Sequence, residues 1–229
     1  MRTGGARPGT FRSRGPATLA LLALVLGAPS TSSAQWIVGA QGGLSAFTVA
    51  GRAPESASYG RQVRLQASGV LGYRIGSSVV LRLEPGLTQR GAGVAYDVEG
   101  IEDPVDSLSL NLDYLTLPVV VQVFTPGGRG FVTAGVELGT LSAATVTTVN
   151  GNEERDVKDR LNGEDLTWIF GAGGLVRRSR PQVSLEFRYA QSLRKAFEGE
   201  PGSSGLPGAL RSRGLSLVAG VSWSLGGDR

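Results

Sequence analysis

Alternation of apolar and polar side chains is the feature that most constrains the fold of this chain, and it is clearest over residues 79–96, VVLRLEPGLTQRGAGVAY. One side of this segment carries the apolar residues Val79, Leu81, Leu83, Pro85 and Leu87. The other side carries the polar residues Arg82, Glu84, Thr88 and Arg90. A period of two places successive side chains on opposite faces of an extended chain. The segment is therefore predicted to be a β-strand with one apolar and one polar face.

The same alternation recurs along the chain and gives eight segments in all: 36–49, 63–75, 79–96, 112–124, 131–146, 166–176, 182–193 and 215–225. Short connections at 76–78, 126–130 and 177–181 alternate strictly with long ones, which include 97–111, 147–165 and 198–213. Strands joined in this way form an up-and-down antiparallel meander. We predict an all-β fold, an eight-stranded antiparallel up-and-down transmembrane β-barrel.

The apolar face of these strands is expected on the outside of the barrel. A soluble lipocalin-like carrier has the same alternation, with the apolar side chains in its lumen and a charged outer surface. About a quarter to a third of a soluble surface is charged, whereas many polar-face positions here are Gly, Ser or Thr. Small polar side chains suit the narrow lumen of eight strands. We therefore expect the apolar face to contact lipid, with short periplasmic turns and long outer loops.

Aromatic residues lie near the ends of the predicted strands. Their positions favour two belts at the membrane interfaces, with Trp36, Tyr73 and Trp223 at the periplasmic rim and Tyr96, Tyr114 and Trp168 at the outer rim. Closure of the barrel should bring the first segment beside the last. Trp36 and Trp223 are then expected to be neighbours, and both chain termini to be periplasmic.

Five charged residues share the inward-facing parity of their strands: Arg82, Glu84, Glu137, Glu186 and Arg188. Such a set can line a narrow ion path, or it can form buried ion pairs that fill the lumen. Side chains can just fill the interior of eight strands, and a buried charge without a partner is costly. We favour a structural charge network that plugs the lumen.

Residues 1–34 have the composition of a cleavable export signal. Arg2, Arg7, Arg12 and Arg14 precede an uncharged apolar stretch at 17–28 that is too short to span a bilayer as a helix. Small residues at 32 and 34 fit a cleavage site before Gln35, which leaves 35–229 as the barrel domain. That domain contains 19 basic and 19 acidic residues. Its zero formal charge gives no reason to expect binding of nucleic acid.

Composition excludes several kinds of chemistry. The chain has no histidine, which excludes Ser-His hydrolysis and histidine-ligated metals, and it has no cysteine. Acidic residues at 99, 102, 103 and 106 lack the spacing of a calcium loop. The glycines of 171–174 lie within a predicted strand, with no phosphate-loop Lys following, and are expected to permit close packing of the wall. We predict no catalytic residue, no cofactor and no metal site.

Six stretches taken together resemble a known family: LRLEPGLTQRGAG, LDYLTLPVVVQVF, GFVTAGVELG, DLTWIFGAGGLV, VSLEFRYAQSL and RGLSLVAGVSW. Their order and motifs, which include Glu84-Pro85, Tyr114-Leu115 and Arg188-Tyr189, are similar to those of the outer membrane protein β-barrel domain family, also called porin-family proteins. The resemblance implies a small barrel of the OmpX/OmpA type in the bacterial outer membrane.

The expected function is that of a non-enzymatic outer-membrane protein with a structural or surface-interaction role. Its expected partners are outer-membrane lipid and lipopolysaccharide, together with the export and barrel-assembly machinery, and we expect a monomer. Three alternatives remain open at this stage: a narrow porin-like channel, a soluble lipocalin-like periplasmic carrier, and a lipid-modifying barrel enzyme, which the absence of histidine disfavours. The sequence does not identify a partner for the outer loops.

Overall fold

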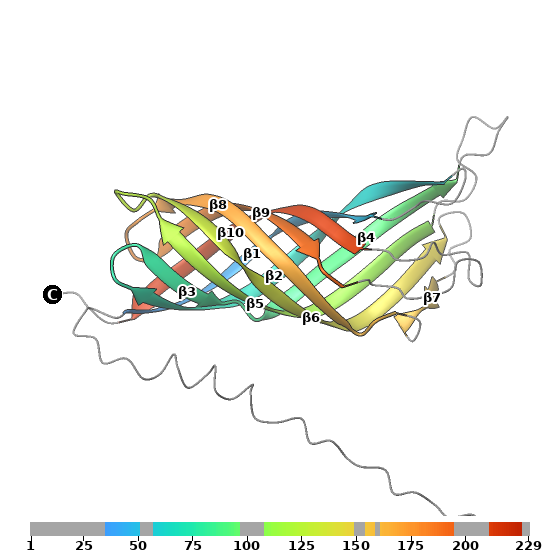
Figure 1. Cartoon of the computed structure of the whole chain (residues 1–229), viewed down its shortest axis with the longest axis horizontal. Helices are drawn as coiled ribbons and strands as arrows, with labels where there is room; N and C mark the ends of the chain where they lie inside the picture. Colours follow the sequence, from blue (N-terminus) through green and yellow to red (C-terminus); the bar gives the residue numbers. More distant parts are fainter. Residues whose placement is uncertain are drawn as a thin grey trace, which may run out of the picture. The chain divides into compact units, whose positions relative to one another are not determined.

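The computed structural model describes residues 35–50, 57–96, 108–148, 154–158, 161–194 and 211–225, which form one antiparallel β-barrel (Figure 1). In chain order the strands are β1 (Gln35–Ala50), β2 (Ala57–Ile75), β3 (Val79–Leu83), β4 (Gly86–Tyr96), β5 (Leu108–Phe124), β6 (Gly130–Thr148), β7 (Glu154–Asp156), β8 (Glu164–Arg177), β9 (Gln182–Ser192) and β10 (Arg211–Leu225). The expected export signal at 1–34 lies outside the described residues. Within the described ranges, no helix has the length and hydropathy needed to cross a membrane.

The sheet closes because β1 pairs with β2 on one side and with β10 on the other. Trp36 lies opposite Leu225 in the pairing with β10 and opposite Tyr73 in the pairing with β2. Closure leaves the wall without a free edge, as a bilayer requires, because hydrocarbon offers no partner for backbone amides.

Strands β3 and β4 act as one strand of the wall. Both pair with β2 on one side and with β5 on the other, and only Glu84 and Pro85 separate them. Proline has no amide hydrogen to donate to a ladder, but the Gly69 amide donates to the Pro85 carbonyl at 2.9 Å, and the Glu84 amide donates to the Pro118 carbonyl at 3.0 Å. The ring therefore has the eight predicted strands, and β7 adds a short extension paired with β6.

Several strands reach further toward the long connections than the sequence indicates. β2 begins at Ala57, β5 at Leu108 and β10 at Arg211. At the starts of β2 and β10 most residues are polar on both faces, so the apolar alternation stops while the backbone pairing continues. β5 instead extends the alternation itself, because apolar and polar residues alternate over its first four positions, Leu108, Ser109, Leu110 and Asn111. The loops predicted at 97–111, 147–165 and 198–213 therefore each give residues to a strand.

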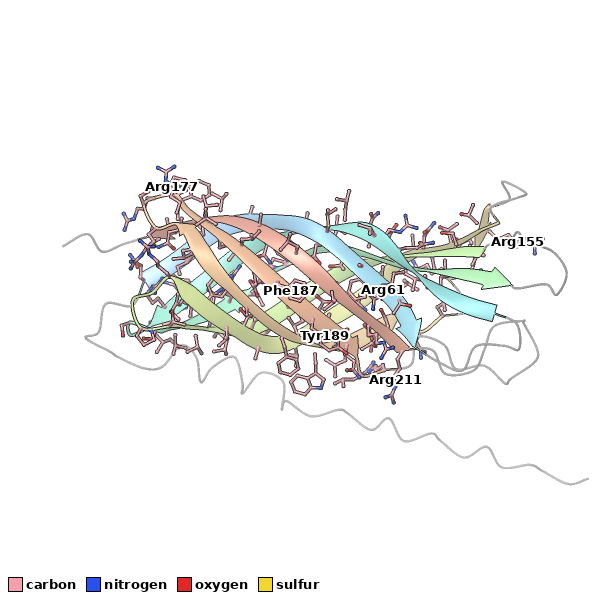
Figure 2. All side chains as sticks on the ribbon, turned by 90° about the horizontal axis from the view of Figure 1, so that it is seen from above. Arg61, Arg155, Arg177, Phe187, Tyr189 and Arg211 are labelled. Atoms are coloured by element: carbon pink, nitrogen blue, oxygen red, sulfur yellow. The ribbon has the colours of Figure 1, made fainter. Side chains whose placement is uncertain are left out.

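The outer face of the wall is apolar along its middle. Exposed side chains there include Leu65, Leu87, Leu115, Val132, Phe170, Phe187 and Leu217. Figure 2 shows Phe187 and Tyr189 between Arg177 at the end of the barrel with the short turns and Arg61 and Arg211 toward the opposite end. This distribution is the reverse of a soluble carrier and matches the apolar band of a transmembrane barrel.

Short turns close one end of the barrel. Gly76 has a φ of 64° in the turn after β2, and Gly127 has a φ of 90° in the turn after β5. These left-handed conformations favour glycine. Because β1 begins and β10 ends beside these turns, we call this the short-turn end, and the opposite end the long-connection end.

Candidate functional site

The interior of the barrel is layered along its axis. An apolar plug near the short-turn end contains Ile37, Val80, Phe124 and Phe131, with Leu175 packed against it. A second apolar plug toward the long-connection end contains Leu112, Tyr114, Leu141 and Ala144. Buried charged side chains occupy the lumen between the two plugs.

The first group of charges, the Glu84 cluster, consists of Gln41, Arg82, Glu84, Glu186 and Arg188. Glu84 has no exposed surface. Arg188 donates two hydrogen bonds to its carboxylate, from Nη1 to Oε2 at 2.6 Å and from Nη2 to Oε1 at 3.1 Å. Arg82 Nη2 lies 3.0 Å from Glu84 Oε1, and Gln41 Nε2 donates to Glu84 Oε2 at 2.6 Å. Arg188 Nε also donates to Glu186 Oε1 at 2.9 Å. Two arginines and two carboxylates balance their charges across the lumen.

The second group, the Arg90 cluster, consists of Arg90, Glu137, Asp165, Thr167 and Ser192. The Arg90 guanidinium donates to both Glu137 and Asp165. The Thr167 hydroxyl donates to Asp165 Oδ2 at 2.7 Å, and the Ser192 hydroxyl donates to Asp165 Oδ1. The Ser192 hydroxyl thus serves the carboxylate oxygen that Arg90 does not contact, and the Thr167 hydroxyl shares the other oxygen with Arg90.

Aromatic rings complete the surroundings of Arg90. Its guanidinium carbon lies 5.2 Å from the centre of the Phe47 ring and 4.8 Å from the centre of the Tyr114 ring. A cation this close to a ring face is attracted by its quadrupole. Arg90 thus joins the charged layer to the apolar plug that contains Tyr114.

A third polar group lies nearer the long-connection end, around Arg64. Arg64 Nη2 donates to Gln62 Oε1 at 2.6 Å and also to Asn111 Oδ1. The β2–β4 register shifts between Arg61 and Gln66. The Ser45 hydroxyl lies 3.3 Å from the carbonyl oxygen of Arg64 in β2 and 3.3 Å from that of Gln89 in β4, the two strands whose register shifts here.

Glycines of β8 make room for lumen side chains. A Cβ on Gly171 would lie 2.7 Å from Glu186 Oε1, and a Cβ on Gly173 would lie 2.6 Å from Phe131 Cζ. These distances are too short for non-bonded carbon contacts. The glycines therefore permit close packing of the charged cluster and the apolar plug, as their place within a strand suggests.

The structure brings four of the five predicted lumen charges together. Arg82, Glu84, Glu186 and Arg188 meet in the Glu84 cluster, whereas Glu137 belongs to the Arg90 cluster. Sequence reasoning did not include Gln41, Arg90 or Asp165 in this set. Gln41 and Arg90 have the inward-facing parity of their strands, and this signal could have identified them. The loop predicted at 147–165 includes Asp165, but β8 begins at Glu164 and gives Asp165 the same inward parity as Thr167.

Five of the six predicted interface aromatics end or lie on the wall of the barrel, and Tyr114 does not. Trp36, Tyr73 and Trp223 lie on the outer face at the short-turn end, and the Trp36 and Tyr73 rings meet edge to face at 5.1 Å. Trp36 and Trp223 are diagonal neighbours across the β1–β10 pair. Trp168 lies on the outer face and stacks on Phe170 at 6.3 Å. Tyr96 ends β4, and its side chain lies outside the described part of the molecule.

The prediction that Tyr114 belongs to an outer belt is wrong. Its side chain is buried in the lumen, with 4% exposure. The reason is parity, because Tyr114 is two residues from the inward-facing Thr116 and Leu112 on β5. Its phenol ring therefore packs beside Arg90 rather than at a membrane interface.

Metal binding has no support within the described ranges. No group of three or more acidic side chains there is arranged to hold a metal ion. The acidic positions 99, 102, 103 and 106 lie outside these ranges. The lumen carboxylates are engaged by arginines, amides and hydroxyls, so their chemistry is that of buried ion pairs.

The fold and its apolar outer face define a transmembrane β-barrel of eight antiparallel strands. The family model described as "Outer membrane protein beta-barrel domain" matches residues 29–198. This match covers most of the 229 residues, and the chain belongs to that family, whose members reside in the bacterial outer membrane. Comparison of the sequence with curated proteins gives no match.

Solved outer-membrane structures are similar to the chain at low identity. Neisserial surface protein A (NspA) has 16% identity and a TM-score of 0.47, covering 83% of this chain and 99% of that chain. Ail of Yersinia pestis, the attachment invasion locus protein, solved with the heparin analogue sucrose octasulfate, has 12% identity and a TM-score of 0.44, covering 82% and 99%. AlkL in lipid bilayers has 14% identity and a TM-score of 0.42, covering 96% and 100%. TM-scores this low carry no inference about function.

Replacement of Arg90 by leucine should destabilise the barrel strongly. Arg90→Leu leaves Glu137 and Asp165 buried without a cation, which typically costs about 3–5 kcal/mol. The measurement is urea unfolding of the barrel in lipid vesicles, followed by tryptophan fluorescence.

The matched control is Arg194→Leu. Arg194 Nη1 lies 2.9 Å from Glu164 Oε2, and the two side chains are 54% and 77% exposed. An exposed pair contributes at most about 1 kcal/mol. Equal losses of stability in the two variants would show that the Arg90 cluster is not a buried ion-pair network.

Proposed function

We propose that this protein is a non-enzymatic component of the bacterial outer membrane with a structural or surface-interaction role, and that its lumen is closed to solutes. The observation that carries the proposal is the continuous filling of the lumen by two apolar plugs with two charge clusters between them. The same filling supports the absence of catalysis, because the described carboxylates and guanidiniums of these clusters bind one another inside the wall.

The size of two spaces in the lumen supports closure. One cavity of about 30 Å³ lies beside the plug at the short-turn end, and one of about 20 Å³ lies between the two charge clusters. About 10–15 Å³ of such space holds one water molecule, so each space suits one to three water molecules rather than a column of solvent. Apolar constrictions also oppose wetting and conduction.

The narrow channel is retained as a second candidate because both cavities adjoin charged side chains. The second cavity is lined by Glu84, Glu137 and Arg188 among others. Rearrangement of the Glu84 cluster would be needed to join the two spaces. That requirement favours the closed barrel.

Surface interaction is proposed for the long connections. We infer that the short turns and both termini are periplasmic, that residues 1–34 direct export, and that the monomeric barrel reaches the membrane through the assembly machinery. The long connections then face the outside, beside lipopolysaccharide, where they are available to partners. Support for this orientation comes from the asymmetry of connection length, which is typical of outer-membrane barrels.

Planar-bilayer recordings test closure. The purified, folded protein should show no stable unitary conductance, because the apolar plugs and ion pairs leave no water-filled path. Heat-modifiable migration on a gel provides the check that the protein in the bilayer is folded. A stable conductance that disappears in Glu84→Ala would establish the channel instead.

Cysteine labelling tests orientation, because the chain has no cysteine of its own. Ser203→Cys lies in the long connection before β10, and Ser77→Cys lies in the short turn after β2. A membrane-impermeant maleimide added to intact cells should label Ser203→Cys and leave Ser77→Cys unlabelled until the cells are broken. The opposite pattern would contradict periplasmic turns and termini.

A further inference from the structure

The cavity of about 30 Å³ at the short-turn side of the Glu84 cluster has an unusual polar lining. Its polar residues come from β2, β3, β5, β9 and β10: Arg74, Arg82, Gln122, Gln182, Ser184 and Ser222. This lining contains two arginines and no carboxylate. The apolar remainder of the lining includes Phe124 and Phe131 of the adjacent plug.

Two of the five buried polar atoms that have no hydrogen-bond partner among the described residues belong to side chains that line this cavity. Arg82 Nε and Gln122 Nε2 have no hydrogen-bond partner among the described residues, and both side chains line the cavity. Thr133 lies directly opposite Gln122 across the β5–β6 pair, and its hydroxyl also lacks a partner there. The exposures of the three side chains are 7%, 5% and 3%. A buried donor without an acceptor costs about 1–3 kcal/mol, and such atoms indicate a bound water or ion.

Charge distinguishes an ion from a water molecule here. Glu84 balances Arg82 at 3.0 Å. Arg74, however, is half-buried over the Phe124 ring, with its guanidinium carbon 5.3 Å from the ring centre. No carboxylate among the described residues forms an ion pair with Arg74. Arg74 thus has no counterion among the described residues and lies beside buried donors that need an acceptor.

We propose that this cavity binds one small inorganic anion of the halide class. The anion accepts hydrogen bonds from Arg82 Nε and Gln122 Nε2, and Arg74 supplies the balancing charge. Water would satisfy the donors but would leave the charge of Arg74 without a counterion.

The second cavity provides a contrast within the same molecule. Its volume is similar, at about 20 Å³, but its lining includes the two carboxylates of Glu84 and Glu137 beside the single guanidinium of Arg188. Carboxylates repel an anion at close range. This cavity is therefore expected to take water, although it lies on the other side of the same ion-pair cluster.

Crystals of the barrel grown in sodium bromide test the proposal by anomalous diffraction. We expect an anomalous peak in the first cavity, within hydrogen-bond distance of Arg82 and Gln122, and none in the second. Gln122→Leu removes the donor at similar volume and should abolish the peak. Gln66→Leu, which alters a glutamine lining the second cavity, should retain it.

A solution measurement uses the same pair of variants. An anion that binds only the folded barrel stabilises it as its concentration rises. The urea midpoint should therefore be higher in sodium bromide than in sodium gluconate of equal ionic strength, for the natural chain and for Gln66→Leu but not for Gln122→Leu. Arg74→Gln, at the edge of the cavity, should weaken bromide binding about tenfold through loss of the charged partner, and it serves as the second variant if Gln122→Leu does not fold.

Three results would overturn the proposal. The first is electron density for water without an anomalous peak in the first cavity. The second is bromide found only at exposed arginines, which would be an adventitious ion only. The third is a bromide peak or a bromide-dependent midpoint that survives in both Gln122→Leu and Arg74→Gln.

Discussion

The carboxylate of Glu84 holds the interior of the barrel together. It lies where Pro85 interrupts the wall strand formed by β3 and β4, and it binds side chains of β1, β3 and β9. Arg188 contacts it from the far side of the lumen, 104 positions further along the chain. A pair so distant in sequence forms only when the sheet has curved and closed. The contact therefore depends on closure of the barrel and in turn stabilises the closed form.

Layering of the lumen follows from the same constraint. Charges buried in a narrow barrel need partners at their own level, because a charge alone in a low dielectric is costly. The Glu84 cluster and the Arg90 cluster meet this need at two levels. Apolar plugs then shield both clusters from solvent, which strengthens the electrostatic attraction within them. The wall itself contributes an apolar outer band, and this combination supports the proposal that the lumen is closed to solutes.

Much of the fold could be predicted from the period-two alternation and the lengths of the connections. Alternation gives the face of each side chain, which is why Glu84 and Arg188 could be assigned to the lumen. It does not give height along the axis, because height depends on the stagger of the hydrogen-bond registers around the ring. Glu137 therefore could not be separated from the Glu84 cluster by sequence alone. Asp165 was missed because its polar neighbours resemble a loop, and Tyr114 was misplaced because residue type outweighed parity.

The central claim is that the ion pair between Glu84 and Arg188 stabilises the closed barrel by linking opposite sides of its wall. A double-mutant cycle on these two residues tests this claim most directly. Each single replacement by leucine leaves an unbalanced buried charge, whereas the double variant leaves Arg82 and Glu186 balanced. Urea unfolding in lipid vesicles should show a double variant more stable than the sum of the single losses predicts, by at least about 1 kcal/mol. Single losses that add to within about 0.5 kcal/mol would show that the two side chains do not interact, and would contradict the account.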